Sequence, residues 1–316
     1  MAESKQYYIG VDVGGTSVKL GLFDEEGDLL GKTSVPTPSL ACGEGHAAVI
    51  SGIEQLMAGV QQPMLFVRGI GLAVPCPVPA SGVITMAANI EIDAPALKEA
   101  LEVRCPHALV RYVNDANAAT MGEVWRGSAQ GHRSMVMVTI GTGLGGGGVV
   151  NGDVIDGAFG AGGEIGHITV DRHETATCGC GKHGCLEQYS SATGVVRCMK
   201  KLLDENPDTP CTLRGTEFAA KDVFDAARNG DALAAREVDE MTDTLGMALA
   251  TIAATADPEM FMVGGGVSRA GEVLFAPLRE HFKVYAFKSC RETPIVPAIL
   301  GNDAGIYGSV RLIVGE

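Results

Sequence analysis

The 316-residue sequence is poor in basic residues. Lys and Arg total 24 against 38 Asp and Glu, so the formal net charge at pH 7 is −14. Proteins that bind nucleic acid or anionic membranes usually carry a basic surface. We therefore expect neither kind of partner, and an anionic ligand would need a local binding site.

The sequence also lacks a long apolar run and a secretory leader. Its longest apolar stretch, residues 245–256, is shorter than the about 20 residues that cross a bilayer. Residues 1–10 show no charged segment followed by an apolar one, so we expect a cytoplasmic protein. The content of 46% hydrophobic and 20% charged residues is typical of a globular protein, and the length suits one large domain or two.

Two nucleotide-binding signatures are missing. The G-x-x-x-x-G-K-[ST] pattern of P-loop proteins does not occur. Residues 141–146 fit the G-x-G-x-x-G fingerprint of dinucleotide-binding enzymes, but an extended segment follows them where the fingerprint requires a helix. The sequence therefore excludes the P-loop class and disfavours a nicotinamide enzyme.

Glycine, by contrast, is abundant, and its 43 copies gather after apolar strands. The clusters fall within residues 7–23, 135–152 and 260–268. The first two share one plan, in which a strand, a glycine turn and a second strand follow one another. A repeated unit of this kind predicts a duplicated architecture with a cleft between two halves, and symmetry places the boundary near Asn114.

The rest of the chain alternates between helical and extended patterns, which predicts an α/β fold. Another helix is expected to begin near Asn302, with Asp303 as its cap. The other helices are expected over residues 45–58, 94–103, 221–228, 231–241 and 242–255, and strands over residues 69–74 and 108–113.

The glycine clusters are candidate phosphate-binding loops. Backbone N–H groups beside a threonine hydroxyl form a compact set of donors for phosphate oxygens, and Thr16 and Thr142 stand next to glycines. Asp12 adds a carboxylate where a phosphate-bound Mg²⁺ would sit, usually through water. The alternative is that these glycines only make tight turns.

Three of the nine cysteines are close in sequence, with the spacing C-x-C-x₄-C at Cys178, Cys180 and Cys185. Thiolates clustered in a reducing compartment favour Zn²⁺ or an iron–sulfur centre over disulfides. A fourth ligand is needed. His167, His173 and His183 are all within reach, and spacing alone does not choose among them.

Four motifs in order carry a family resemblance: residues 12–16, 139–147, 163–167 and 178–187. They resemble the signatures of the ROK family of sugar kinases, repressors and open reading frames. The likeness runs nearly end to end and is strongest to the bacterial glucokinases of that family. It implies the actin-like ATPase (ribonuclease H-like) fold, with two α/β domains around a cleft and a small zinc-bound loop. The smaller domain would span residues 1–114 plus about 303–316, and the larger residues 115–302.

The resemblance also implies roles for individual residues. Asp115, in the Asn114-Asp115 pair, would be the general base. The residues implied to bind the sugar are Asn89, Asn114, Asp115, Glu164, His167 and Glu187. Those implied to bind the nucleotide are Asp12, Gly14, Gly15, Thr16, Lys19, Thr142, Gly143, Gly264, Gly265 and Gly266. The resemblance selects His167 as the fourth zinc ligand, so that the implied set is His167, Cys178, Cys180 and Cys185.

The activity that the resemblance implies is transfer of phosphate from ATP, with Mg²⁺, to the 6-hydroxyl of glucose by a homodimer. Two departures leave the sugar open: Cys76 stands where the family usually has glycine, and residues 90–93 lack the Leu and Trp common in glucokinases. Fructose, N-acetylglucosamine and N-acetylmannosamine are the alternative substrates. A sugar-sensing regulator is a rival function, which we disfavour because no helix-turn-helix precedes the first strand. A polyphosphate donor is disfavoured by the acidic charge.

Overall fold

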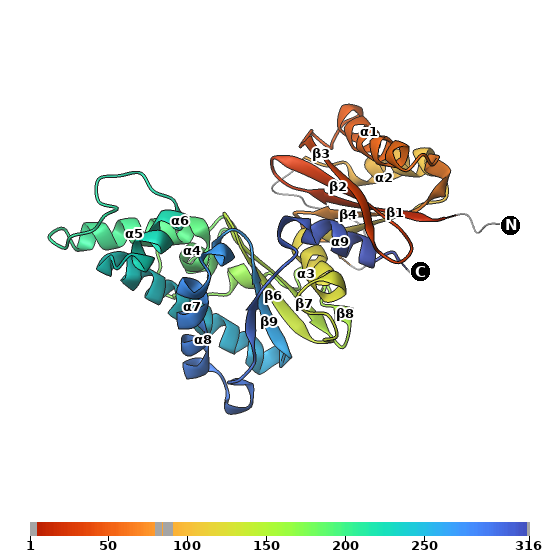
Figure 1. Ribbon diagram of the computed structural model, residues 1–316. Helices are drawn as coiled ribbons and strands as arrows, with labels where there is room; N and C mark the ends of the chain where they lie inside the picture. The colour runs from red at the N-terminus through yellow and green to blue at the C-terminus, as the bar shows by residue number, and fades with distance from the viewer. Residues whose placement is uncertain (1–4, 80–83, 85–90, 315–316) are drawn as a thin grey trace.

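The computed structural model describes residues 5–79, 84 and 91–314, and Figure 1 shows its two five-stranded sheets. The first sheet has the order β3-β2-β1-β4-β5 and the second the order β10-β9-β6-β7-β8. The first sheet consists of β1 (Tyr7–Val13), β2 (Ser17–Phe23), β3 (Leu29–Pro36), β4 (Val67–Val74) and β5 (Leu109–Asn114). The second consists of β6 (Met135–Ile140), β7 (Leu144–Val150), β8 (Asp153–Val154), β9 (Met260–Gly264) and β10 (Ile295–Pro297).

The two sheets have one topology. In the first, β1 pairs antiparallel with β2 and parallel with β4, and in the second β6 pairs antiparallel with β7 and parallel with β9. The outer strands repeat this correspondence, because β3 and β8 are antiparallel additions and β5 and β10 are parallel ones. The duplicated architecture predicted from the glycine hairpins is therefore confirmed.

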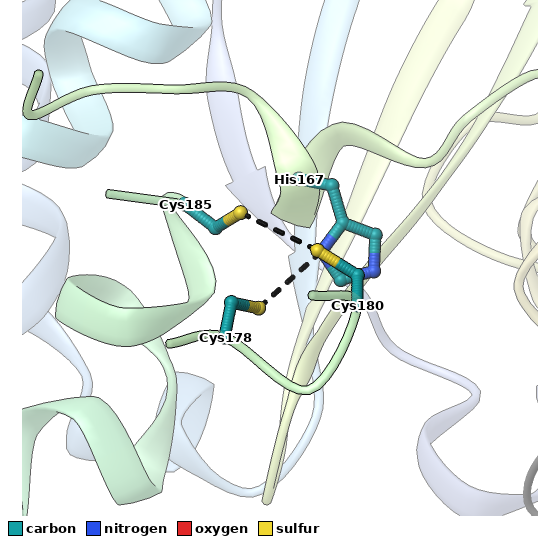
Figure 2. Close-up of side chains that lie close together, drawn as sticks. All are labelled: His167, Cys178, Cys180 and Cys185. Atoms are coloured by element: carbon teal, nitrogen blue, oxygen red, sulfur yellow. Dashed lines mark hydrogen bonds between the residues drawn. The ribbon is translucent and has the colours of Figure 1, made fainter. Parts of the chain in front are cut away.

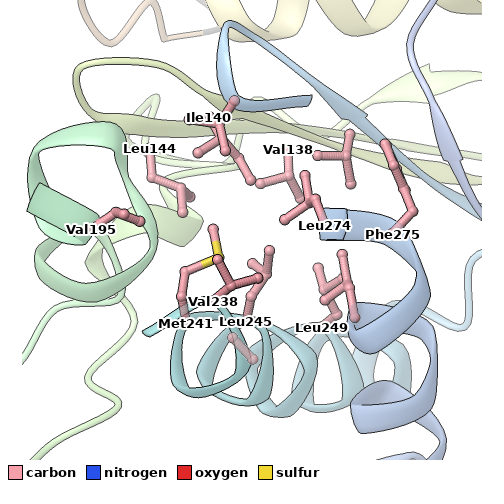
Figure 3. Packing of buried hydrophobic residues seen from close by; sticks show 14 of the residues in the cluster. Val138, Ile140, Leu144, Val195, Val238, Met241, Leu245, Leu249, Leu274 and Phe275 are labelled. Carbon is pink, nitrogen blue, oxygen red and sulfur yellow. The ribbon is translucent and has the colours of Figure 1, made fainter. Parts of the chain in front are cut away.

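Helices cover both sheets. α1 (Gly43–Gly59) and α2 (Ala94–Arg104) share a hydrophobic core with the first sheet, and α9 (Ala304–Arg311) crosses its other face. The second sheet packs its β6 side chains against α7 (Ala232–Ala256) and α8 (Glu272–Tyr285), as Figure 3 shows. The remaining helices are α3 (Asp115–Arg126), α4 (Glu187–Ser190), α5 (Ala192–Glu205) and α6 (Ala220–Arg228). Short 3₁₀ turns are η1 (Met64–Phe66), η2 (Ile165–His167), η3 (Val267–Ala270), η4 (Lys288–Cys290) and η5 (Gly301–Asp303).

α3 and α9 lie side by side between the two sheets (Figure 1). Glycines permit this close approach: a Cβ on Gly122 would lie 2.3 Å from the carbonyl oxygen of Ala304, and one on Gly308 would lie 1.6 Å from that of Ala118. Because these obstacles are backbone atoms, larger residues would force the helices apart. This helix pair joins the two halves directly below the cleft.

Most predicted elements are confirmed, with boundaries shifted by a few residues. The two helices expected over residues 231–241 and 242–255 are one helix, α7, and that division was wrong. Thr242 does not break the helix because its hydroxyl donates to the carbonyl oxygen of Val238, one turn earlier. Asp303 stands at the N-cap position of α9 as expected, but its side chain makes no capping bond and pairs with the Lys32 ammonium at 2.7 Å. In the described part of the chain, no helix is long and apolar enough to span a membrane.

Candidate active site

A cleft of about 1150 Å³ lies between the two halves. Its walls come from the carboxyl ends of the parallel strands β4, β5, β6 and β9 and from the loops that follow them, a location typical of ligand sites in α/β proteins. The predicted site residues in its lining are Asp12, Lys19, Asn114, Asp115, Gly143, Glu164, His167, Cys180, Glu187, Gly264, Gly265 and Gly266. Chain segments far apart in sequence thus meet around one cavity.

Asp115 stands at the junction of β5 and α3. Asn114 caps this helix, since its side-chain oxygen accepts hydrogen bonds from the backbone N–H groups of Ala116 at 3.0 Å and Asn117 at 3.1 Å. The Asn114 amide also donates to the carbonyl oxygen of Cys76 at 3.2 Å. These bonds orient the first turn of α3 and with it the Asp115 carboxylate, which accepts from the Ala116 N–H at 2.8 Å.

The surroundings of Asp115 suit a proton acceptor. Burial raises the pKa of its carboxyl group to about 6, and the nearby charges of Asp12 and Glu164 add to this, while the Ala116 N–H acts in the opposite direction. A carboxylate with this pKa is ionised at neutral pH and holds a proton more readily than an exposed one. The carboxylate of Asp115 is therefore chemically suited to accept a proton near neutral pH.

Asp12 and Lys19 face each other across the β1–β2 hairpin. The two residues are directly opposite each other in the β1–β2 pairing. The Lys19 ammonium lies 3.5 Å from the Asp12 carboxylate and also donates a hydrogen bond to the carbonyl oxygen of Asn302 at 3.0 Å. Burial raises the pKa of Asp12, and Lys19 opposes that shift. Gly305, in the first turn of α9, leaves room for the carboxylate, because a Cβ there would lie 2.7 Å from Asp12 Cγ.

The turn between β6 and β7 is held by Glu187, the first residue of α4. One oxygen of this carboxylate accepts from the backbone N–H of Leu144 at 2.9 Å, and a Cβ on Gly143 would lie 2.4 Å from the same oxygen. The glycine run 145–148, which sequence analysis placed in this turn, belongs to strand β7. A Cβ on Gly147 would lie 2.2 Å from the Thr120 hydroxyl, so this glycine makes room for α3, while Gly146 and Gly148 face Ile165 and Ile155.

The end of the cleft opposite Asp115 is bounded by two backbone segments. The glycine turn after β9 includes Gly265, whose φ of +83° is the left-handed conformation that favours glycine. Beside it runs the connection from β10 to η5, which lines the cleft with Ala298, Ile299, Gly301 and Asn302. Sequence reasoning missed this connection; the only signal near it was the helix start at Asn302.

A cluster of three cysteines and one histidine adjoins the cleft. The ligand atoms of His167, Cys178, Cys180 and Cys185 all lie within 4.8 Å of one another, and Figure 2 shows the four side chains converging. The Cys180 and Cys185 sulfurs are 3.7 Å apart, and the Cys178 sulfur is 3.8 Å from His167 Nδ1. Zinc–sulfur bonds of about 2.3 Å in a tetrahedron separate two sulfurs by about 3.8 Å. The donor set and its spacing therefore fit one tetrahedral metal ion.

The other two candidate histidines lie outside this cluster. The His183 ring contacts the carbonyl oxygen of Ala176 at 3.2 Å, and the backbone N–H of His173 donates to the Asp171 carboxylate at 2.8 Å. His167 has a second ring nitrogen, Nε2, which lies 3.9 Å from the Glu164 carboxylate in the cleft. One imidazole thus joins the metal cluster to the cleft.

Some predicted site residues are not in the cleft lining. Gly14, Gly15 and Thr16, all within the described chain, form the β1–β2 turn outside it, and the carbonyl oxygen of Thr142 accepts a hydrogen bond from the Thr193 hydroxyl. Asn89 lies outside the described residues. Conversely, the cleft includes Ser268 and Arg269 of η3, which sequence reasoning did not select.

Comparisons with known proteins agree with the motifs. Residues 8–316 match the sequence profile of the ROK family. The chain belongs to the ROK family. Relatives and neighbours within it include a glucokinase of Halalkalibacterium halodurans, 38% identical over 98% of this chain and 96% of that protein.

Solved ROK structures superimpose over nearly the whole chain. A ROK family glucokinase from Streptomyces griseus in complex with glucose and AMPPNP is 33% identical, has a TM-score of 0.76, and matches 98% of this chain and 99% of its own. A ROK hexokinase from Thermus thermophilus is 31% identical with a TM-score of 0.83, and the match covers 98% of each chain. The α/β actin-like ATPase fold expected from the sequence is therefore confirmed.

Proposed function

We propose that this ROK protein is a glucokinase, which transfers the γ-phosphoryl group of ATP to the 6-hydroxyl of glucose with Asp115 as general base. The observation that carries this proposal is the half-buried Asp115 carboxylate, with its raised pKa, in a cleft between two glycine-rich halves. A ROK glucokinase structure that superimposes on the chain contains glucose and AMPPNP, a sugar and an ATP analogue. The chain covers nearly the full length of its glucokinase relatives.

In this proposal, Asp115 accepts the proton of the sugar hydroxyl as that hydroxyl attacks phosphorus. Phosphoryl transfer depends mainly on positioning and charge neutralisation, so a base contributes about 10²–10⁴-fold. The N-cap bonds of Asn114 hold the base in place. Its amide retains a second N–H that is available to a sugar hydroxyl.

The sugar would be bound by the polar groups at the Asp115 end of the cleft. Glu164 and Glu187 offer carboxylate oxygens, His167 Nε2 faces the same space, and Asn89 stays a prediction for this set. Charge-assisted hydrogen bonds contribute about 1.5–3 kcal/mol each, so the loss of one discriminates an epimer by about tenfold or more. Selectivity among hexoses would follow from these few groups.

The nucleotide would occupy the other end, against Gly264, Gly265 and Gly266. Backbone N–H groups of the turn between β6 and β7 would face the phosphates, and a contact with the β1–β2 turn, which lies outside the cleft lining, stays a prediction. Asp12 fits a Mg²⁺ held through water, and Lys19 supplies a cation beside it. When bound, Mg²⁺ neutralises phosphate charge and leaves the protein to orient the reacting groups.

We assign Zn²⁺ to the Cys₃His cluster and give it a structural role. Four protein ligands close a tetrahedral site and leave no position for water. The site lies beside Glu187, since the Cys178 thiol is 3.9 Å from the second oxygen of that carboxylate. Zinc would thus stabilise the loop that presents Glu164, His167 and Glu187 to the sugar.

The test is release of ADP from ATP·Mg²⁺ with glucose, mannose, fructose, galactose, N-acetylglucosamine and N-acetylmannosamine, for the wild type and for Asp115→Asn. We expect glucose to be preferred and the variant to lose at least about 10²-fold in kcat. Asp153→Asn, which removes an exposed carboxylate on β8, is the matched control and should keep full activity. Calorimetric glucose binding by Asp115→Asn checks that the site is intact.

Other outcomes would overturn parts of this proposal. Turnover with another sugar alone would make the protein a kinase of that sugar. Sugar binding without turnover would favour a sensor, and activity with polyphosphate in place of ATP would change the donor. The homodimer stays a prediction, and a cytoplasmic location is proposed because ATP and reduced thiolates are both available there.

A further inference from the structure

Glu123 is a buried carboxylate that lies near the C-terminal end of α3 and outside the cleft lining. Its side chain is fully shielded from solvent. Burial of a carboxylate is costly unless donors surround it. The donors that contact Glu123 therefore indicate what it holds together.

Those donors come from two different parts of the chain. Oε2 accepts from the backbone N–H of Ser128 at 2.8 Å and from its hydroxyl at 3.1 Å. Oε1 accepts from the backbone N–H of Leu300 at 2.7 Å, across 177 positions of sequence. Gly127 leaves space for this arrangement, since a Cβ there would lie 2.0 Å from Glu123 Oε2.

Leu300 belongs to the connection that runs from β10 into the first residues of η5, residues 298–302, which lines the nucleotide end of the cleft. In this connection Ile299 is 65% exposed although it is a large apolar residue, and it faces the same cavity as the glycine turn after β9. An exposed apolar side chain in a cleft is a surface on which a flat base packs. The position of this connection should therefore affect nucleotide affinity.

The connection has three tethers. At its start, the Ala298 N–H donates to the carbonyl oxygen of Val263 in β9, at 3.0 Å. At its end, the carbonyl oxygen of Asn302 accepts from Lys19 on the β1–β2 hairpin. Glu123 supplies the middle tether, and it is the one that fixes the connection to α3, the helix that begins with Asp115.

We propose that Glu123 is a positioning residue for the nucleotide: through the Leu300 N–H it holds residues 298–302, and with them Ile299, in register with the helix that begins at Asp115. This inference rests on the proposed ATP-dependent activity. Glu123 touches no reacting group, so its loss should weaken ATP binding while the sugar end of the cleft is retained.

Two variants weaken the same hydrogen bond from opposite sides. Glu123→Gln keeps the shape of the side chain but leaves one acceptor oxygen for the N–H groups of Leu300 and Ser128, which two oxygens serve in the wild type. Leu300→Pro removes the N–H donor, and the φ of −72° at Leu300 matches a proline ring. Because a hydrogen bond to a charged group is worth about 1.5–3 kcal/mol, each variant should raise the KM for ATP at least about tenfold. The KM for glucose should be nearly unchanged.

The double variant separates this tether from a general loss of structure. If the two substitutions remove one interaction, their effects on ATP affinity are non-additive. The double variant then binds ATP almost as well as the single variant that has the lower affinity. Affinity for a non-hydrolysable ATP analogue is measured by titration calorimetry, and thermal unfolding is recorded alongside. Should Glu123→Gln fail to fold, Leu300→Pro, which leaves α3 untouched, decides the question alone.

Glu237 provides a matched control. It too is a buried glutamate, in α7, and its Oε2 has no hydrogen-bond partner among the described residues. Burial raises its pKa to about 8, with a smaller contribution from Glu240, so at pH 7 it is mostly protonated and closely resembles glutamine. Glu237→Gln should leave the KM values for both substrates unchanged.

Three results would overturn the proposal: unchanged ATP affinity in a folded Glu123→Gln or Leu300→Pro variant, equal losses of ATP and glucose affinity, or strictly additive effects in the double variant. The calorimetric arm needs no turnover. A wild-type protein that fails to phosphorylate glucose would therefore count against the proposed function, while nucleotide binding would still test the role of Glu123.

Discussion

The two halves of the molecule share one sheet topology but use their glycine hairpins differently. In the first half, β1 and β2 place Asp12 and Lys19 in the cleft, so the hairpin contributes charged side chains. In the second half, the β6–β7 turn contributes mainly backbone. Its position is fixed by Glu187 of α4, which accepts a hydrogen bond from the backbone N–H of Leu144. The first hairpin thus supplies charge, and the second supplies a backbone surface whose position depends on the neighbouring loop.

The glycines within the strands reflect the helices that cross them. A Cβ on Gly10 would lie 2.2 Å from the carbonyl oxygen of Ile306 in α9, whereas the obstacle nearest to Gly147 is the Thr120 side chain in α3. The two halves therefore use glycine for the same purpose, which is close approach of a helix. Gly10 and Gly147 are thus packing residues, whereas the glycines in the turns are candidates for phosphate contact.

The largest effect is expected from loss of the metal, which would act on the second half alone. Cys180→Ser should abolish zinc binding and lower the free energy of unfolding by more than about 3 kcal/mol, because a closed metal site contributes directly to folding. Elemental analysis and thermal unfolding measure this. The control is Cys42→Ser, an exposed thiol in the first half, which should keep both zinc and stability. Zinc-free protein with full activity would refute the assignment.

The next largest effect is a loss of stability on substitution of the strand glycines, and it should differ between the two halves. Gly10→Ala should destabilise the protein by about 1–3 kcal/mol or more, since backbone atoms of α9 cannot move aside easily. Gly147→Ala should cost less, because its nearest obstacle is the Thr120 hydroxyl and its nearest backbone atom, Ala116 O, lies at 2.9 Å rather than 2.2 Å. Chemical denaturation measures both. Gly15→Ala, with no atom within 4 Å of the new Cβ, should keep wild-type stability, and a loss there as large as in Gly10→Ala would contradict this interpretation.

A smaller effect concerns charge that acts between the halves. The pKa of Asp115 is raised to about 6, so the ionised base is lost as pH falls below that value, and kcat/KM should fall about tenfold per pH unit there. Asp12 on the first hairpin contributes to the raised pKa. The residual activity of Asp12→Asn should therefore have its acid limb at lower pH. A limb that stays in place would show that Asp12 does not act on the base.

Much of the fold could be predicted from local pattern. The glycine hairpins predicted the duplication, and the helix expected from residue 94 begins there, with the Asp93 side chain accepting from the Ala96 N–H. The division of α7 was wrong because residue types alone do not show that Thr242 is satisfied within the helix. The glycine run of β7 was interpreted as a turn, because α3, the helix against which Gly147 packs, lies many residues earlier in the chain.

The candidate site was predictable to the extent that short motifs carry it. The carboxylates of the cleft and the Cys₃His cluster stand in recognisable local patterns, and the structure brings them together. Glu123 had no such signal. Its partners are a neighbouring turn and a distant N–H, and a glutamate on a helix gives no indication of a contact with Leu300.

The sequence by itself determined the strand and turn chemistry, the family, and the residues with the right functional groups, because those properties depend on residue type and spacing along the chain. Only the tertiary structure decided which glycines pack against helices and which backbone segment Glu123 holds. The physical reason is that each of these depends on contacts between segments far apart in the chain, where distance and burial set the interaction energy.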